Sequence, residues 1–226
     1  MASIDRGTRP TQQSKSVNLY IPTPDPPGPH VDFDHIAKMP VWDENGDMIP
    51  FEYLYSKEKA IIVFLRFFQC YTSIEYAQDL AKIPVNYLKE AGVRLIVIGC
   101  IPWNYIKSFK GDVQFPHEVY VDQEKNIYKA LKLRTRSTEG GSQSSPHVKS
   151  SILGGIFKST WKIMRFNSFK PDINQLGGQL ILGPGQVESF YHIDRNMLDH
   201  TPINRLLAIA GVQQVNFDKH KRILQL

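Results

Sequence analysis

The sequence predicts one α/β domain built on a mixed β-sheet flanked by helices. Two runs of β-branched and aromatic residues, Lys59–Phe67 and Val93–Gly99, are typical of strands buried on both faces. A helical pattern lies between them, and a strand–helix–strand unit makes the two strands parallel with a right-handed crossover. Towards the C-terminus, Gly178–Ile193 predicts two strands joined by a Gly-Pro-Gly turn, and such a hairpin is antiparallel.

The start of the chain is expected to lie outside the domain. Residues 1–33 are polar, and the proline-rich run Ile21–His30 can form neither a helix nor a central strand. We predict an extended tail over residues 1–33 and a domain over residues 34–226. Asn45-Gly46, placed between short apolar stretches, indicates a β-hairpin at the beginning of the domain.

The remaining elements follow from periodicity and from residues that end helices. Ser73–Ile83 has a helical apolar period, which Pro84 kinks or ends. A helix resumes afterwards and is capped by Gly92. The other predicted elements are a third strand at Glu118–Asp122, a helix at Glu124–Leu133, and a last helix with a Thr201 cap, Pro202 just inside it and a stop at Gly211.

An insertion is predicted over residues of about 134–176, before the C-terminal hairpin. Its first part, Arg134–Lys149, is rich in serine and glycine and is typical of a long loop. Its second part, Ser150–Phe166, has apolar residues on one helical face and Lys and Arg on another. This helix either packs on the domain or binds a membrane surface or a partner.

Composition excludes several classes of function. The net charge of +5 comes from dispersed basic residues without a nucleic-acid motif, so we expect no nucleic-acid partner. No apolar run approaches the ~20 residues of a transmembrane segment. Two cysteines suit a reducing compartment, and the start lacks the apolar centre of a secretory signal, so we expect a cytoplasmic protein. Neither a metal site nor a cofactor site is predicted, because metal-ligand spacings and phosphate-binding glycine loops are absent.

Cys70 is the candidate reactive residue. It follows a buried strand and precedes a helix that is expected to begin at Tyr71 or Thr72, and sites of open α/β sheets form at this edge. A helix N-terminus favours the thiolate, which is the nucleophile. In an extended chain Arg66 would point to the same side as Cys70. It would either stabilise the thiolate or pair with Glu75 or Asp79. The alternative is that Cys70 is a small buried structural residue.

A series of motifs resembles the peroxiredoxin-like 2 family of AhpC/TSA antioxidant, thioredoxin-like proteins. The resemblance extends from about Val31 to about Phe217 and rests on these stretches in order: FLRFFQCYTSIEYAQDLAKIP, LIVIG, HEVYVD, IYKALKL, SPHVKS, GGQLILGPG and HIDRNMLDHTPINRLL. It implies a thioredoxin-like fold. It also places Cys70 at the first cysteine of a CxxC motif and Glu75 at a glutamate that follows the motif. Ser73 stands where the second cysteine often lies.

Ser73 predicts one-cysteine chemistry. In a CxxC site the second thiolate resolves the mixed disulfide, which a serine cannot do. Cys70 would therefore react with a peroxide or a disulfide and be regenerated by an external thiol, glutathione or thioredoxin. Ser73 could still hydrogen-bond the thiolate or cap the helix.

Other residues offer alternatives at the same sheet edge. Cys100 follows the second strand, so oxidised protein could carry a Cys70–Cys100 disulfide; the other reading is an inert thiol. His117 and His147 lie in loops that could approach the edge. The second functional class is an interaction protein with a signalling or metabolic role that kept the fold and lost turnover.

Overall fold

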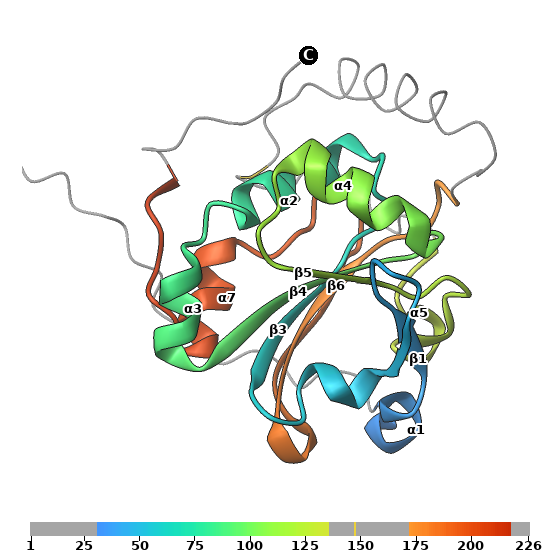
Figure 1. Cartoon of the computed structure of the whole chain (residues 1–226), viewed down its shortest axis with the longest axis horizontal. Coiled ribbons are helices and arrows are strands. Elements are labelled where there is room, and N and C mark those ends of the chain that lie inside the picture. Colours follow the sequence, from blue (N-terminus) through green and yellow to red (C-terminus); the bar gives the residue numbers. More distant parts are fainter. Residues whose placement is uncertain (1–30, 136–146, 148–171, 218–226) are drawn as a thin grey trace, which may run out of the picture.

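The computed structural model describes residues 31–135, 147 and 172–217 (Figure 1). A 7-stranded sheet runs in the order β2-β1-β5-β4-β3-β6-β7. The central strands β3 (Lys59–Phe64), β4 (Val93–Gly99) and β5 (Glu118–Val121) are parallel. The outer strands pair antiparallel: β1 (Pro40–Trp42), β2 (Met48–Pro50), β6 (Gly178–Gly183) and β7 (Val187–Ile193). The predicted α/β class with a mixed sheet is therefore confirmed.

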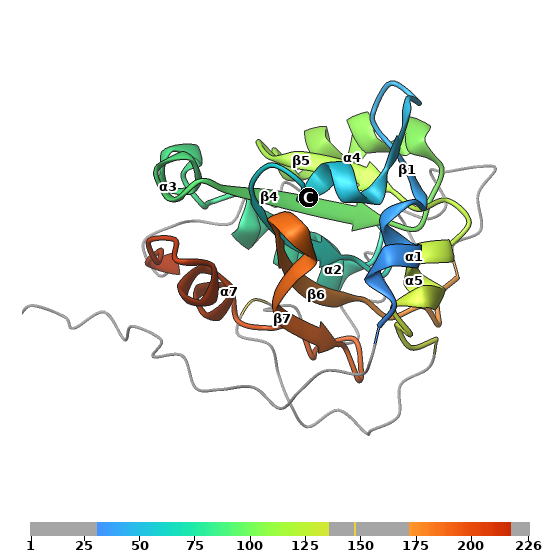
Figure 2. The ribbon, with the colours of Figure 1, turned by 90° about the horizontal axis from the view of Figure 1, so that it is seen from below.

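Helices cover both faces of the sheet (Figures 1 and 2). One hydrophobic cluster joins alternate residues of β3 and β4, such as Val63 and Val97, to the helices α2 (Tyr71–Leu80), α3 (Val85–Ala91), α4 (Ile106–Val113) and α7 (Ile203–Ala210). A second cluster joins the intervening residues, such as Ile62 and Ile96, to α1 (Phe33–Ala37), α5 (Asn126–Ala130) and the 3-10 turn Phe51–Leu54. Alternation of side chains along a strand produces these two layers.

Both predicted hairpins are present. β1 and β2 pair antiparallel around a turn in which Gly46 has φ +88°, a conformation that favours glycine. β6 and β7 pair antiparallel around Pro184–Gln186, where Gly185 has φ +75°. The β6–β7 hairpin places β6 beside β3, the strand that leads to Cys70.

Three details differ from the predictions. β3 ends at Phe64, so Arg66 lies in an irregular segment rather than on a strand. The cap of α7 is Pro202, because the Thr201 hydroxyl instead donates to Gln179 Oε1 at 2.7 Å. No helix was predicted where α4 lies; it is short and contains Gly111, a weak helix former.

The predicted loop and amphipathic helix of the insertion lie outside the described residues, apart from its two ends and His147. The division into a tail and one domain stays a prediction. Within the described ranges, every helix is too short or too polar to span a bilayer.

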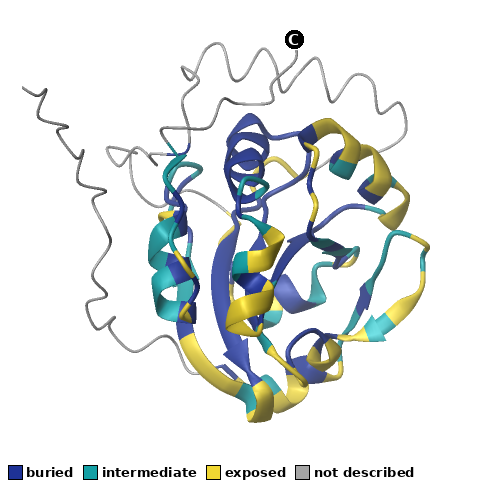
Figure 3. Ribbon diagram, turned by 60° about the vertical axis from the view of Figure 1, so that its left-hand side comes forward, coloured by how far each residue is buried: buried dark blue, intermediate teal, exposed yellow. Residues whose placement is uncertain are grey.

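Helix α2 is buried along its whole length, whereas α4 exposes one side (Figure 3). All ten residues of α2 are buried, including Thr72, Ser73 and Asp79. Buried polar groups need hydrogen-bond partners, so the contacts of these residues determine what the helix can do.

Gly177 is expected to be essential for the junction between β3 and β6. A Cβ at this position would lie 2.1 Å from the Phe64 carbonyl oxygen and 3.1 Å from Asp194 Oδ2. Gly177→Ala should therefore lower the free energy of unfolding by about 1–3 kcal/mol, since backbone must move to admit the methyl group. Urea unfolding measures this. Gly111→Ala is the control: outside its own helix backbone and chain neighbours, no atom lies within 4 Å of its Cβ position, and we expect equal or higher stability.

Candidate functional site

Cys70 lies at the N-terminus of α2. β3 ends at Phe64, a short irregular segment follows, and Cys70 is the N-cap residue of the helix that begins at Tyr71. The predicted helix start is confirmed. The residue is 3% exposed, so its thiol lies in a nearly dry environment. Low dielectric strengthens each polar contact that the sulfur makes.

Two polar groups contact the thiol. Arg66 Nη1 donates to Cys70 Sγ at 3.2 Å, and Thr72 Oγ1 lies 3.0 Å from the same sulfur. A thiolate can accept a hydrogen bond from both groups, and the bond from the guanidinium is charge-assisted. The sulfur therefore lies beside two hydrogen-bonding groups at the N-terminus of α2, where backbone amides lack helical partners.

Arg66 is held in place by the far end of the insertion. Its Nε donates to the Gln175 carbonyl at 3.0 Å and its Nη2 to the Ile173 carbonyl at 2.6 Å. Of the two alternatives for Arg66, the contact with the thiol is present. Asp79, one of the predicted carboxylate partners, instead pairs with Lys82 at 2.7 Å and with His147 at 2.9 Å.

Ser73 makes neither of the contacts predicted for it. Its Oγ is buried and has no hydrogen-bond partner among the described residues, and the helix has no side-chain cap. The hydroxyl that reaches the sulfur belongs to Thr72, which the sequence did not single out. The reason is geometric. Cys70 is the N-cap of α2, and the side chain of Thr72, two residues later, turns back towards its sulfur.

Cys100 is buried on the other face of the sheet from Cys70. It belongs to the second hydrophobic cluster, whereas Cys70 belongs to the first. Its Sγ donates to the Arg66 carbonyl at 2.8 Å, and burial raises the pKa of this thiol to about 12. Cys100 is therefore protonated at neutral pH, and both thiols are free. A Cys70–Cys100 disulfide would require one of them to cross the sheet edge.

The two predicted histidines lie away from Cys70. His117 immediately precedes β5, at the amino end of the parallel strands, next to the carbonyls of Leu80 and Ile83. His147 accepts from the Ile203 amide at 3.1 Å through Nε2 and contacts Asp79 through Nδ1. His147 thus joins the C-terminal half of α2 to the start of α7.

His117 should make stability depend on pH. Burial lowers its pKa to about 4 from an ordinary value of 6.5. Between these values the unfolded chain binds more protons, so stability rises with pH. This pKa difference adds at most about 3 kcal/mol to the free energy of unfolding. The added stability is fully present above about pH 6.5 and is lost as the pH falls to about 4. Urea unfolding of His117→Gln at several pH values should show a weaker dependence, and the exposed His35→Gln should not.

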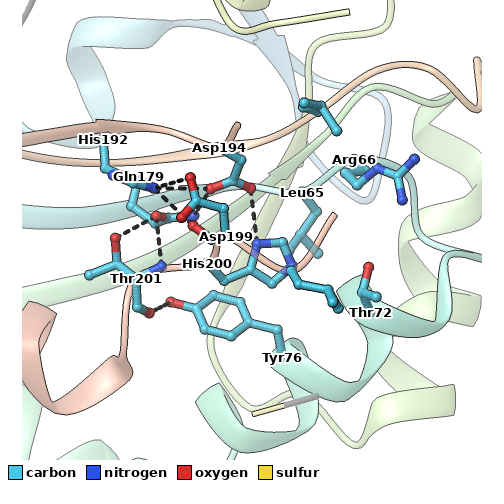
Figure 4. Close-up of polar contacts among 12 residues, drawn as sticks. Leu65, Arg66, Thr72, Tyr76, Gln179, His192, Asp194, Asp199, His200 and Thr201 are labelled. Atoms are coloured by element: carbon cyan, nitrogen blue, oxygen red, sulfur yellow. Dashed lines mark hydrogen bonds and ion pairs between the residues drawn. The ribbon is translucent and has the colours of Figure 1, made fainter. Parts of the chain in front are cut away.

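The sequence reasoning missed a buried polar network beside the site (Figure 4). Asp194 Oδ2 lies 2.9 Å from His200 Nδ1, and Asp194 Oδ1 accepts from Gln179 Nε2 at 3.1 Å. The ring of His200 packs on Tyr76 of α2, whose hydroxyl donates to the Thr201 carbonyl at 2.6 Å. The polar run His192–His200, which starts near the end of β7 and contains two aspartates and two histidines within nine residues, was the available signal.

The topology and the position of the cysteine define a class of protein. A sheet with three parallel central strands, an antiparallel C-terminal hairpin, and a cysteine at the N-terminus of the helix after the first parallel strand is the thioredoxin-like arrangement. Solved structures agree: a peroxidoxin, BcpB, from Mycobacterium tuberculosis superimposes with a TM-score of 0.53 at 10% identity, covering 76% of this chain and 91% of that one.

The chain belongs to the AhpC/TSA antioxidant enzyme family, whose profile matches residues 79–196. It is 43% identical over 193 residues to peroxiredoxin-like 2C from Homo sapiens, covering 84% of this chain and 85% of the relative. It is 44% identical to peroxiredoxin-like 2C from Bos taurus over the same shares. The predicted resemblance and the thioredoxin-like fold are confirmed, and they support a thiol redox role.

Proposed function

We propose that this protein is a one-cysteine thiol redox protein of the cytoplasm. Cys70 would attack a peroxide or a disulfide, and glutathione or thioredoxin would regenerate it. The observation that carries the proposal is the pair of contacts on the sulfur, 3.2 Å to Arg66 Nη1 and 3.0 Å to Thr72 Oγ1, at a helix N-terminus. A cysteine kept only to fill space does not need a buried guanidinium beside it.

The chemistry balances with one cysteine. With a peroxide, an S–O bond forms as the O–O bond breaks, giving a sulfenic acid and an alcohol or water. Two equivalents of an external thiol then return the sulfur to the thiol and leave as a disulfide. Because Cys70 is only 3% exposed, we expect small peroxides to react faster than disulfides, which need more room around the sulfur.

The test is to trap the intermediate. Protein treated with hydrogen peroxide and then with a sulfenic-acid reagent should carry the label on Cys70 by peptide mass spectrometry. Glutathione added first should prevent labelling while peroxide is consumed. Cys70→Ser should lose both activities, and Cys100→Ser should keep them. Turnover that survives in Cys70→Ser would overturn the proposal.

Two observations favour the second candidate, an interaction protein without turnover. Ser73 removes the thiol that would resolve Cys70, and the sulfur itself is nearly inaccessible. In that case proteins that bind the wild-type chain would bind Cys70→Ser equally, and peroxide would leave Cys70 unlabelled.

A further inference from the structure

His200 has one ring nitrogen in use and one without a partner. Nδ1 lies 2.9 Å from Asp194 Oδ2, and both side chains are buried. Nε2 is buried and has no hydrogen-bond partner among the described residues. When Nδ1 donates to the carboxylate, Nε2 carries a lone pair and can accept a proton. A buried, oriented histidine with an open acceptor nitrogen is the arrangement of an acid–base group.

Helix α2 brings this nitrogen to the side of the Cys70 site. The His200 ring packs on Tyr76, with ring centroids 4.7 Å apart. Thr72 stands one helical turn before Tyr76 on the same face, and its hydroxyl contacts the Cys70 sulfur. Figure 4 shows the ring of His200 between Asp194 and α2, with its second nitrogen on the side of Thr72 and Arg66.

The carboxylate of Asp194 is itself held in place by its neighbours. Gln179 of β6 donates to Asp194 Oδ1 at 3.1 Å, and the Asp194 amide donates to the Gly177 carbonyl at 3.1 Å. A buried carboxylate that orients a histidine stabilises the imidazolium formed when the ring takes up a proton.

We propose that Asp194 and His200 form an acid–base pair that takes the proton of the Cys70 thiol through the Thr72 hydroxyl. The imidazolium then faces the Asp194 carboxylate, and the Cys70 anion faces Arg66. No hydrogen bond between Thr72 Oγ1 and His200 Nε2 is present in the structure, so the transfer takes place when the two side chains move together, with or without a peroxide.

The remaining step rests on the proposed function. Sγ attacks one oxygen of a peroxide, the S–O bond forms, the O–O bond breaks, and the leaving oxygen takes the proton from His200 Nε2. The sum is thiol plus peroxide giving sulfenic acid plus alcohol or water. Sulfur is oxidised by two electrons and the peroxide is reduced by two.

Several titratable groups surround the pair and enter any pH profile. Tyr76 and Tyr128 stay neutral, because burial raises the pKa of each well above its usual value. The other charged or titratable groups around the pair are Asp79 and His147 beside Tyr76, His192 beside Asp194, Asp199 beside His192, and Arg66 with Cys70 beside Thr72.

The chain offers a matched control in His147. Its Nδ1 also lies 2.9 Å from a buried carboxylate, that of Asp79, and its ring also packs on Tyr76, with centroids 5.5 Å apart. The difference is that His147 Nε2 already accepts from the Ile203 amide. A structural role would make the two histidines behave alike, whereas an acid–base role belongs to His200 alone.

The experiment is alkylation of Cys70 by iodoacetamide between pH 5 and pH 9, with Cys100→Ser as the background. We expect His200→Gln to slow the reaction about tenfold at pH 7 and to remove one ionisation from the profile, as loss of a general base does. Asp194→Asn should also slow alkylation and remove this ionisation. His147→Gln should change neither the alkylation rate nor the number of ionisations. Equal profiles for folded His200→Gln and His147→Gln would overturn the inference.

A second measurement covers the case in which His200→Gln does not fold. Proton uptake by His200 and loss of the Cys70 proton are coupled, so each must alter the other. The NMR titration of the His200 ring should therefore differ between the wild-type chain and Cys70→Ser, and an identical titration would overturn the inference. Alkylation uses no peroxide, so slow alkylation of His200→Gln in a protein that consumes no peroxide would reject the proposed function alone.

Discussion

Replacing Arg66 by Gln should slow alkylation of Cys70 at neutral pH by about 10- to 100-fold. The guanidinium donates to the sulfur at 3.2 Å in a buried site. A hydrogen bond to a charged group contributes about 1.5–3 kcal/mol, which corresponds to this range of rates if the thiolate is the reacting form. Arg66→Lys should recover only part of the rate, because the three N–H donors of a lysine share one nitrogen, whereas Arg66 uses three separate nitrogens for the sulfur and the carbonyls of Gln175 and Ile173.

Arg94 provides the control for the structural part of this effect. Its guanidinium also binds two backbone carbonyls, of Tyr53 and Leu54, and an anionic partner, Glu118. Arg94→Gln removes a comparable set of contacts far from the sulfur, so it should lower stability and leave the alkylation rate unchanged. If Arg94→Gln slowed alkylation as much as Arg66→Gln, the effect of Arg66 would be one of stability alone.

Replacing Ser73 by Cys should convert the site into a dithiol. The two cysteines would occupy the N-cap and the third position of α2, the spacing at which a second thiolate attacks the first sulfur within one helical turn. The oxidised variant should have two fewer reactive thiols than the reduced one. Turnover with thioredoxin should rise at least tenfold over wild type, as expected when resolution becomes intramolecular.

The chain tolerates this change better than most core substitutions. Ser73 Oγ is buried without a hydrogen-bond partner in the described residues, so replacing it by sulfur breaks no bond there. Ser73→Ala is the control: it should be neutral or slightly stabilising and should leave turnover unchanged, because an unpaired buried hydroxyl is removed. Failure of Ser73→Cys to form a disulfide on mild oxidation would show that the two side chains diverge.

The fold was predictable because strong local patterns coincide with the elements of the sheet. Buried runs became β3 and β4, and Gly92 caps α3 in a left-handed conformation. The two errors at element ends have one cause. Tertiary contacts moved them, since Arg66 turns towards Ile173 and Gln175, and Thr201 turns towards Gln179. Patterns within a short window do not contain partners 20 or 100 residues away.

The site was predictable only in part for the same reason. Cys70 and Arg66 are close in the sequence, and the contact between them was among the predicted alternatives. Thr72 was missed because the CxxC motif points to position 73, whereas the start of the helix decides which hydroxyl reaches the sulfur. His200 was missed because it lies more than 100 residues after α2 in the chain and reaches that helix only when the C-terminal hairpin has paired with β3.

The contacts that hold Arg66 also limit which chimaeras between this protein and its relatives would keep a working site. The carbonyls of Ile173 and Gln175 that hold the guanidinium belong to a tight turn, in which Asp172 accepts from the Asn174 amide at 3.1 Å and pairs with Lys125 at 2.7 Å. A chimaera that exchanges the chain between β5 and β6 should keep a reactive cysteine only if it retains this turn. The C-terminal end of the exchanged segment, rather than its length, would therefore decide where the two chains can be joined.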